Sequence, residues 1–198
     1  MIDGIDGLAG GFGVIATLVL SILLYQDNIN FALLGITTTG ALLAFLRHNL
    51  SKNKKIFMGD TGTMIVGFCI AVLILRFLNT SRLSVNNDYY NTAPVIAISI
   101  LFYPLLDTLR VFILRVFKYK TSPFSADRYH IHHRFIDLKL SHLQVSSVLL
   151  IINLLAIIMA FVINFKDWSN RLWFIGILSS ALYLILFFVL RAIKKHSA

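Results

Sequence analysis

The chain has 198 residues, of which 58% are hydrophobic and 14% are charged, and its mean hydropathy is +0.80. Because soluble domains contain about 45–50% apolar residues, this composition excludes a soluble globular protein and indicates an integral membrane protein. The net charge of +9 then reflects the orientation of membrane loops rather than a nucleic-acid partner. The single Cys69 excludes a disulfide framework.

Six apolar segments are long enough to cross a membrane as helices, which need about 17–25 residues each. In chain order they are residues 8–25, 30–46, 61–78, 93–114, 145–165 and 172–190. Pro104 lies inside the fourth segment and is able to kink it. No repeat or linker divides the chain. We therefore expect residues 1–198 to form a single all-α domain, a polytopic membrane bundle of about six transmembrane helices.

Basic residues divide the loops into two groups. The connections 47–60 and 110–144 and the tail after residue 190 contain 14 of the 18 Lys and Arg residues, and the other ends of the spans contain 4. Because positively charged loops stay in the cytosol, we expect these segments to be cytosolic and, with six spans, the N-terminus as well. Three clusters of reactive side chains, which begin at Asp3, Phe57 and Asp127, then share one aqueous face.

The first cluster, Asp3-Gly4-Ile5-Asp6-Gly7, lies directly before the first apolar segment. Residues three apart share a face of a helical turn, so both carboxylates are able to point into one site. Glycines let the backbone approach a ligand closely. This pattern predicts metal or nucleotide binding. The alternative is structural, because acidic residues at a helix N-terminus cap the helix and interact favourably with its dipole.

The second cluster, Phe57-Met58-Gly59-Asp60-Thr61-Gly62-Thr63, opens the third apolar segment. Asp60 is able to ligate a hard cation such as Mg2+, which brings phosphates with it, and the helix start favours anions. Phe57 is placed to stack on a base or to cover the membrane edge. The alternative for Asp60 or Thr61 is an N-cap. Asn49, at the end of the second segment, offers its amide to a nucleobase or caps that helix.

The third cluster is Asp127-Arg128-Tyr129-His130-Ile131-His132-His133-Arg134, which holds three of the six histidines of the chain. A His-x-His pair is able to bind a transition metal, but the flanking Arg128 and Arg134 disfavour a cation. Arginine beside histidine suits a diphosphate or a sugar phosphate instead. A solvated basic loop is the structural alternative.

In this order the three clusters resemble the polyprenyl-phosphate N-acetylhexosamine-1-phosphate transferases, bacterial enzymes of glycosyltransferase family 4. These enzymes begin the synthesis of O-antigen and other cell-envelope polysaccharides. The resemblance covers essentially the whole chain. It implies transfer of a sugar 1-phosphate from a UDP-N-acetylhexosamine, such as UDP-N-acetylglucosamine, to undecaprenyl phosphate with release of UMP. The implied cofactor is Mg2+ or Mn2+.

The resemblance also implies roles for particular residues. Asp60 matches the metal-binding catalytic aspartate, and Asp3 and Asp6 match the acidic pair of the uridine and metal region, with Asp3 as a second metal ligand. Asn49 and Phe57 match the nucleobase pocket, although the spacing from Asn49 to Asp60 is about one residue longer than in the usual pattern.

The histidine-rich segment matches the part of the family that handles the sugar phosphate and diphosphate. This match implies that the remaining catalytic residues are His130, His132, His133 and Arg134, with Arg128 in substrate binding. The implied location is the bacterial plasma (inner) membrane, with the active face in the cytosol. The implied partners are the two substrates, membrane lipid and a second copy of the chain in a homodimer, and no nucleic acid.

The chain also departs from the family pattern. Family members are considerably longer and carry an Asp-Asp-x-x-Asp motif on an earlier cytosolic loop, whereas this chain has no adjacent pair of aspartates. We therefore expect an N-terminally truncated chain that is inactive alone. One alternative is a non-catalytic six-span membrane protein, derived from the transferase, that binds a nucleotide or has a regulatory role. A metal-ion transporter is a further alternative, disfavoured because the acids lie at the membrane surface rather than along the spans.

Overall fold

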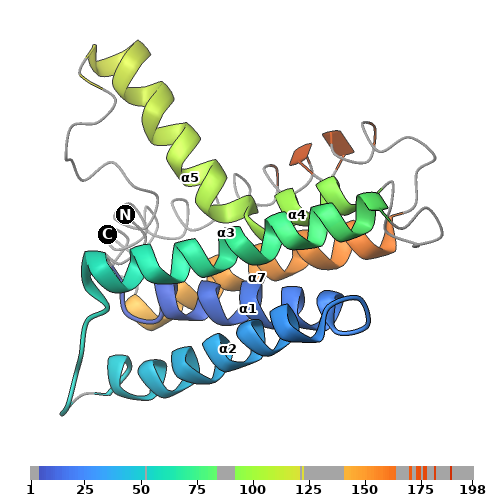
Figure 1. Cartoon of the computed structure of the whole chain (residues 1–198). Coiled ribbons are helices and arrows are strands. Elements are labelled where there is room, and N and C mark those ends of the chain that lie inside the picture. Colours follow the sequence, from blue (N-terminus) through green and yellow to red (C-terminus); the bar gives the residue numbers. More distant parts are fainter. Residues whose placement is uncertain are drawn as a thin grey trace.

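The computed structural model describes residues 5–51, 53–83, 92–120, 122 and 141–163, with a few single positions between 170 and 188. These parts contain helices and no strand, which confirms the predicted all-α class. The described helices are α1 (Leu8–Leu24), α2 (Ile29–Asn49), α3 (Gly59–Leu83), α4 (Ala93–Ile100), α5 (Phe102–Ile113), the short π-helix η2 (Leu114–Tyr119) and α7 (His142–Val162). In Figure 1, α1, α2, α3 and α7 run side by side, and α5 projects away from them.

The helices match the predicted spans closely. Three of them, α2, α3 and α7, are long and apolar enough to cross a membrane, and α4 and α5 together make a fourth candidate. The first predicted span, 8–25, corresponds to α1, a shorter apolar helix of 17 residues. The predicted sixth span, 172–190, lies outside the described residues apart from single positions. The fold is a multi-pass membrane helix bundle.

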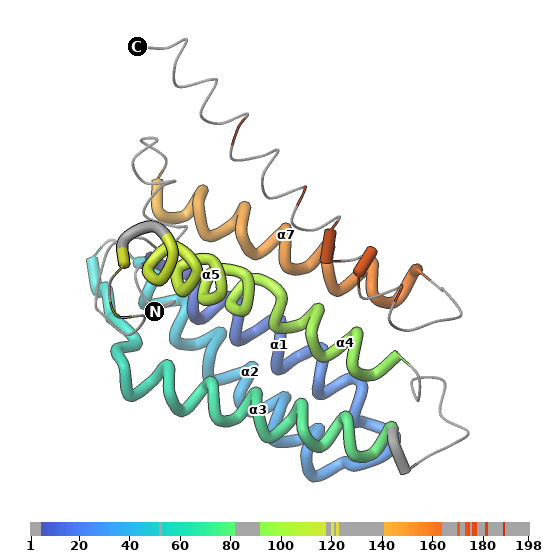
Figure 2. Tube along the Cα trace, turned by 90° about the horizontal axis from the view of Figure 1, so that it is seen from above, coloured from blue at the N-terminus to red at the C-terminus, as the bar shows by residue number. Residues whose placement is uncertain are grey.

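Helix α1 lies at the centre of the bundle and packs against α2, α3 and α7. Figure 2 shows it between α7 on one side and α2 and α3 on the other. Its fully buried side chains Ala16, Leu20 and Leu24 belong to a core that is completed by Ala32 of α2 and by residues of α3, α4 and α7. Because α1 carries the first cluster at its start, the position of that cluster depends on three neighbouring helices.

Small and hydroxyl residues bring α1 and α2 close together. A Cβ atom at Gly35 of α2 would lie 2.9 Å from Ser21 Cβ and 3.0 Å from the Thr17 carbonyl oxygen of α1. The Thr17 and Thr39 hydroxyls are 2.7 Å apart, and Ser21 Oγ donates to the Ala32 carbonyl. Small residues that let two backbones approach, with polar side chains bonding across them, are typical of helix pairs in membranes.

The fourth predicted span is broken at Leu101 and bends by 68° between α4 and α5. Pro104 has no N–H, so the Ile100 carbonyl loses its helical partner. Asn153 of α7 compensates, because its Nδ2 donates to the Ile100 carbonyl at 3.2 Å and its Oδ1 accepts from the Tyr103 N–H at 3.0 Å. The predicted kink is therefore confirmed, and a buried amide from another helix pairs the backbone groups that it exposes.

The outer faces of the bundle are apolar. The most hydrophobic 18-residue windows of α2 and α3 are only 22% buried inside the structure. Large apolar side chains point outward there, such as Phe68, Met64 and Leu43. A helix that is apolar on all sides suits contact with lipid, so these faces agree with a membrane setting.

Candidate functional site

The first cluster forms a turn that leads into α1. Leu8 N–H donates to the Ile5 carbonyl, and Gly7 adopts a left-handed conformation with φ 79° at the N-cap of α1. A side chain at Gly7 would be strained there, which explains the glycine. No side-chain hydrogen bond caps the first turn of α1. The alternative that Asp6 caps α1 is therefore wrong, and its carboxylate points to other partners.

Asn49 joins this turn to the connection between α2 and α3. Its Oδ1 accepts from the Gly7 N–H at 2.7 Å, and its Nδ2 donates to the Ile56 carbonyl at 2.8 Å. The side chain is buried, with 4% of Asn49 exposed. One amide thus ties two backbone segments together, next to Asp6 and next to Phe57. The predicted contact between Asn49 and a nucleobase stays a prediction.

Lys55 connects the side chains of the same two segments. Its Nζ lies 2.5 Å from Asp6 Oδ2 and 5.2 Å from the centre of the Phe57 ring. Phe57 is 69% exposed, so much of its ring is open to solvent or to a ligand. An acid, a cation and an exposed aromatic ring therefore lie together at the start of α1.

The first turns of α7 reach the same place. His142 Nδ1 lies 3.4 Å from Asp6 Oδ2, and Ser146 Oγ donates to the Asp6 carbonyl at 2.8 Å. A capping box fixes the start of α7, with the Ser141 side chain accepting from Gln144 N–H and the Gln144 side chain accepting from Ser141 N–H. The helix that follows the histidine-rich segment in sequence is thus anchored to Asp6.

Asp60 is exposed in the first turn of α3. Because α3 begins at Gly59, Asp60 and Thr61 lie within that turn rather than before it, so neither occupies the N-cap position. A carboxylate in the first turn of a helix is stabilised by the helix dipole. Since it remains exposed, it is accessible to a cation or to a polar ligand.

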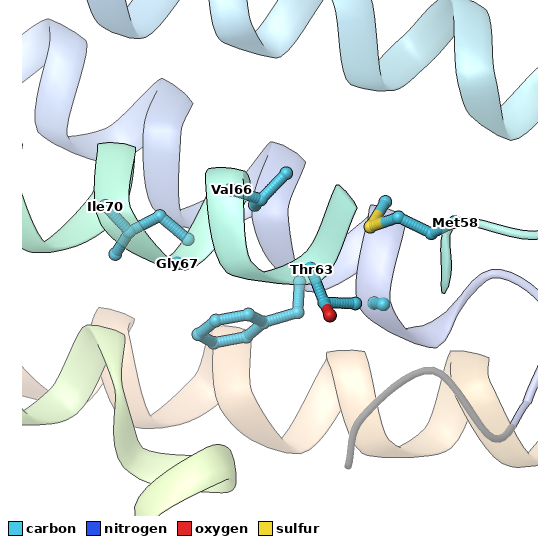
Figure 3. Close-up of a pocket in the computed structure, with 7 residues that line it drawn as sticks. Met58, Thr63, Val66, Gly67 and Ile70 are labelled. Atoms are coloured by element: carbon cyan, nitrogen blue, oxygen red, sulfur yellow. The ribbon is translucent and has the colours of Figure 1, made fainter. Parts of the chain in front are cut away.

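A small apolar cavity lies between α1 and α3, close to Asp60 in sequence. Figure 3 shows the side chains that line it, and the full set is Ala9, Phe12, Met58, Thr63, Val66, Gly67 and Ile70. Its volume of about 70 Å³ is well below the several hundred Å³ of a typical ligand site. This cavity is too small to hold a nucleotide.

The structure brings together some of the predicted site residues. Asp6, Asn49 and Phe57 are gathered at the start of α1, and Asp60 lies in the first turn of the neighbouring helix α3. The other predicted residues lie outside the described residues: Asp3, Arg128, His130, His132, His133 and Arg134.

Three residues of this region were missed by sequence reasoning: Lys55, His142 and Ser146. Lys55 stands two residues before Phe57 but was counted only as an orientation charge. His142 and Ser146 are separated from Asp6 by more than 130 positions, and no local pattern marks them.

Among the described residues, no three His, Cys, Asp or Glu side chains gather closely enough to hold a metal ion. Mg2+ usually keeps several waters and binds one or two carboxylates together with substrate phosphates. An exposed aspartate such as Asp60 supplies the oxygen donor that this chemistry requires, so it fits one position of a Mg2+ site.

Comparison with known proteins gave consistent matches. Residues 1–78 match the family described as Glycosyl transferase family 4. The chain is 33% identical over 161 residues to a decaprenyl-phosphate N-acetylglucosaminephosphotransferase of Mycobacterium leprae, which covers 73% of this chain and 39% of that protein. It is 33% identical over 177 residues to the protein of the same description in Mycobacterium tuberculosis H37Rv, covering 81% of this chain and 42% of that protein.

A third relative comes from Yersinia pestis and is described as an undecaprenyl-phosphate alpha-N-acetylglucosaminyl 1-phosphate transferase. Identity to it is 34% over 137 residues, which cover 67% of this chain and 35% of that protein. The matched part therefore spans well under half the length of these curated relatives. No solved structure matches the chain.

Proposed function

This chain belongs to glycosyl transferase family 4, and from that premise we propose that its protein transfers N-acetylhexosamine 1-phosphate from a UDP-sugar to undecaprenyl phosphate. The relatives are named as transferases of this type. The structural observation that carries the proposal is the meeting of Asp6, Lys55 and the exposed Phe57 ring at the start of α1. An aromatic face beside a carboxylate is suited to a nucleobase.

The proposed reaction is a single phosphoryl exchange. An oxygen of the lipid phosphate forms a bond to the β-phosphorus of the UDP-sugar. The bond between the β-phosphorus and the oxygen that bridges to the α-phosphate breaks, and UMP leaves with that oxygen. The lipid substrate is already held by the membrane. The protein therefore contributes mainly orientation of the two phosphates and neutralisation of their charge.

We assign the metal role to Asp60, with Asp3 as a second ligand, and Mg2+ or Mn2+ as the ion. A divalent ion supplies charge neutralisation on the diphosphate when it is bound. Asp60 holds its place in the first turn of α3, and its exposure supports this role.

The nucleotide and the sugar diphosphate use different parts of the protein in this proposal. Phe57 stacks on the uracil ring while Asp6 and Asn49 border it. The remaining catalytic and binding roles, on the sugar phosphate and diphosphate, belong to a group that includes Arg128, His130, His132, His133 and Arg134. The anchoring of α7 at Asp6 supports this, because Arg134 precedes His142 by only eight positions.

The proposed setting is the bacterial inner membrane, with the start of α1 on the cytosolic side. The predicted cytosolic segments contain 14 of the 18 basic residues of the chain, which supports this orientation. In that setting the product begins a cell-envelope polysaccharide such as O-antigen, and the protein works as a homodimer.

The assay is release of UMP from UDP-N-acetylglucosamine by membranes that contain the protein and undecaprenyl phosphate. We expect Asp60→Asn to lower the rate by about 100-fold or more, the order of effect of removing one charge-stabilising group. The matched control is Asp27→Asn, which removes an acid from the turn between α1 and α2 at the other end of the bundle.

Chelation of divalent cations by EDTA should abolish the release, and added Mg2+ should restore it. Equal rates in Asp60→Asn and Asp27→Asn would refute the assignment of Asp60. Binding of UDP-sugar without any UMP release would instead favour a non-catalytic nucleotide-binding protein. The prediction that the 198-residue chain is inactive by itself is tested by the same assay on that chain alone.

A further inference from the structure

Lys55 contacts two residues that the proposed function places at the nucleotide. Its ammonium lies 2.5 Å from Asp6 Oδ2, across 49 positions of sequence, and 5.2 Å from the centre of the Phe57 ring. A cation within about 6 Å of an aromatic centre is attracted by the ring. A single side chain therefore holds a carboxylate of one segment and a ring of another.

These contacts are too exposed to contribute much to overall stability. The side chains of Lys55 and Asp6 are 37% and 18% exposed, and ion pairs that solvent screens in this way contribute little to the free energy of unfolding. Their main effect is on orientation. His142 approaches the same Asp6 Oδ2 at 3.4 Å, so two side chains restrict where that carboxylate points.

The backbone on both sides of these contacts is held separately. Asn49 fixes Gly7, directly after Asp6, and Ile56, directly before Phe57, through its buried amide. The backbone positions of Asp6 and Phe57 are thus set without Lys55. What remains for Lys55 to set is the direction of the Asp6 carboxylate and of the Phe57 ring.

We propose that Lys55 is a positioning residue of the nucleotide site: its ammonium orients the Asp6 carboxylate and the Phe57 ring together, so that both present themselves to one uridine moiety. The proposal rests on the proposed function, because it takes that site to bind a uridine nucleotide. Lys55 acts through Asp6 and Phe57 and takes no part in the exchange of phosphorus bonds.

The test measures UMP binding by titration calorimetry to the purified protein with Mg2+ present, and the steady-state constants for the UDP-sugar. We expect Lys55→Met to weaken UMP binding and raise KM by roughly three- to tenfold, the range of one cation–π contact and one exposed ion pair, with kcat within about twofold of the unaltered protein. Lys55→Arg keeps the charge and should recover most of the affinity.

The matched control is Lys54→Met, which removes the same charge from the adjacent exposed position of the same connection. Equal UMP affinity in Lys55→Met and Lys54→Met would overturn the positioning role alone. A fall in kcat with unchanged KM and unchanged UMP affinity would also overturn it. Absence of UMP binding to the unaltered protein would overturn the proposed function, and this inference with it.

Discussion

At the scale of single residues, Asn49 shows how one side chain can organise a site. Its position at the end of α2 is compatible with a helix cap or with a contact to a ligand. In the structure its amide crosses to the Gly7 N–H and to the Ile56 carbonyl, both of which belong to other segments. A buried amide that pairs two backbone groups stabilises the arrangement of both segments, because either group left unpaired would be costly.

The first prediction concerns this amide. Asn49→Ala should destabilise the protein by about 1–3 kcal/mol, because the Gly7 N–H and the Ile56 carbonyl lose their partner. Thermal unfolding in detergent measures the change. Asn53→Ala, at an exposed position of the same connection, is the control and should alter the melting temperature little. Similar melting temperatures for the two variants would contradict the role given to Asn49.

At the scale of elements, two features of the packing depend on how helices meet. Helices α1 and α2 approach closely at Gly35, with hydroxyl groups bonding across the contact. Helices α4 and α5 bend at Leu101, where the Asn153 amide of α7 pairs the freed backbone groups. The first feature needs a residue without a side chain, and the second needs a polar residue in an otherwise apolar helix.

The second prediction compares two glycines of α2. Gly35→Ala should lower the melting temperature, since the new Cβ would lie 2.9 Å from Ser21 Cβ and 3.0 Å from the Thr17 carbonyl oxygen. Gly40→Ala, where a Cβ meets nothing within 4 Å, should raise stability by up to about 1 kcal/mol through higher helix propensity. A melting temperature that rises in both variants would contradict the close approach of α1 and α2.

The third prediction concerns the break between α4 and α5. Asn153→Leu should destabilise the protein by about 2 kcal/mol, because the Tyr103 N–H and the Ile100 carbonyl then lack their side-chain partner in an apolar setting. Leu154→Ala, at the neighbouring and partly exposed position of α7, serves as the control. Equal melting temperatures in the two variants would show that the amide does not support the bend.

At the scale of the whole molecule, the bundle has two chemically different ends. At one end lie Asp6, Lys55 and His142, which come from the turn before α1, the connection before α3 and the start of α7. At the other end Arg76 of α3 lies 5.3 Å from the ring centre of Phe31 in α2. Because α1 rises about 25 Å over its 17 residues, the two ends are separated by nearly the thickness of a membrane core.

The fourth prediction follows from this separation. Gln26 is exposed in the turn after α1, and Lys54 is exposed in the connection after α2. Each is replaced by cysteine in a protein whose own cysteine has been removed by Cys69→Ala. An impermeant maleimide added to intact cells should label Gln26→Cys, whereas Lys54→Cys should react only after the membrane is opened, because the basic connections stay in the cytosol. Labelling of both positions in intact cells would contradict the proposed orientation.

Sequence patterns were sufficient for the helical class of this protein and for five of its helical segments. Apolar runs of this length can satisfy their backbone in lipid only as helices, so their bounds follow from local composition, as α2 and α7 illustrate. The order of the three clusters was likewise a signal in the sequence, and it led to the same family whose model matches residues 1–78. The side chains that contact those clusters could not be predicted from local sequence patterns.

The tertiary structure alone decided which groups meet at the candidate site. That Asp6 pairs with Lys55 and His142, and that Asn49 turns towards Gly7 and Ile56, depends on contacts between residues that are mostly far apart in the chain. The position of the bend, three residues before Pro104, depends on Asn153 of another helix. In lipid each apolar run forms its helix independently, but the polar side chains take their partners only when the helices pack together.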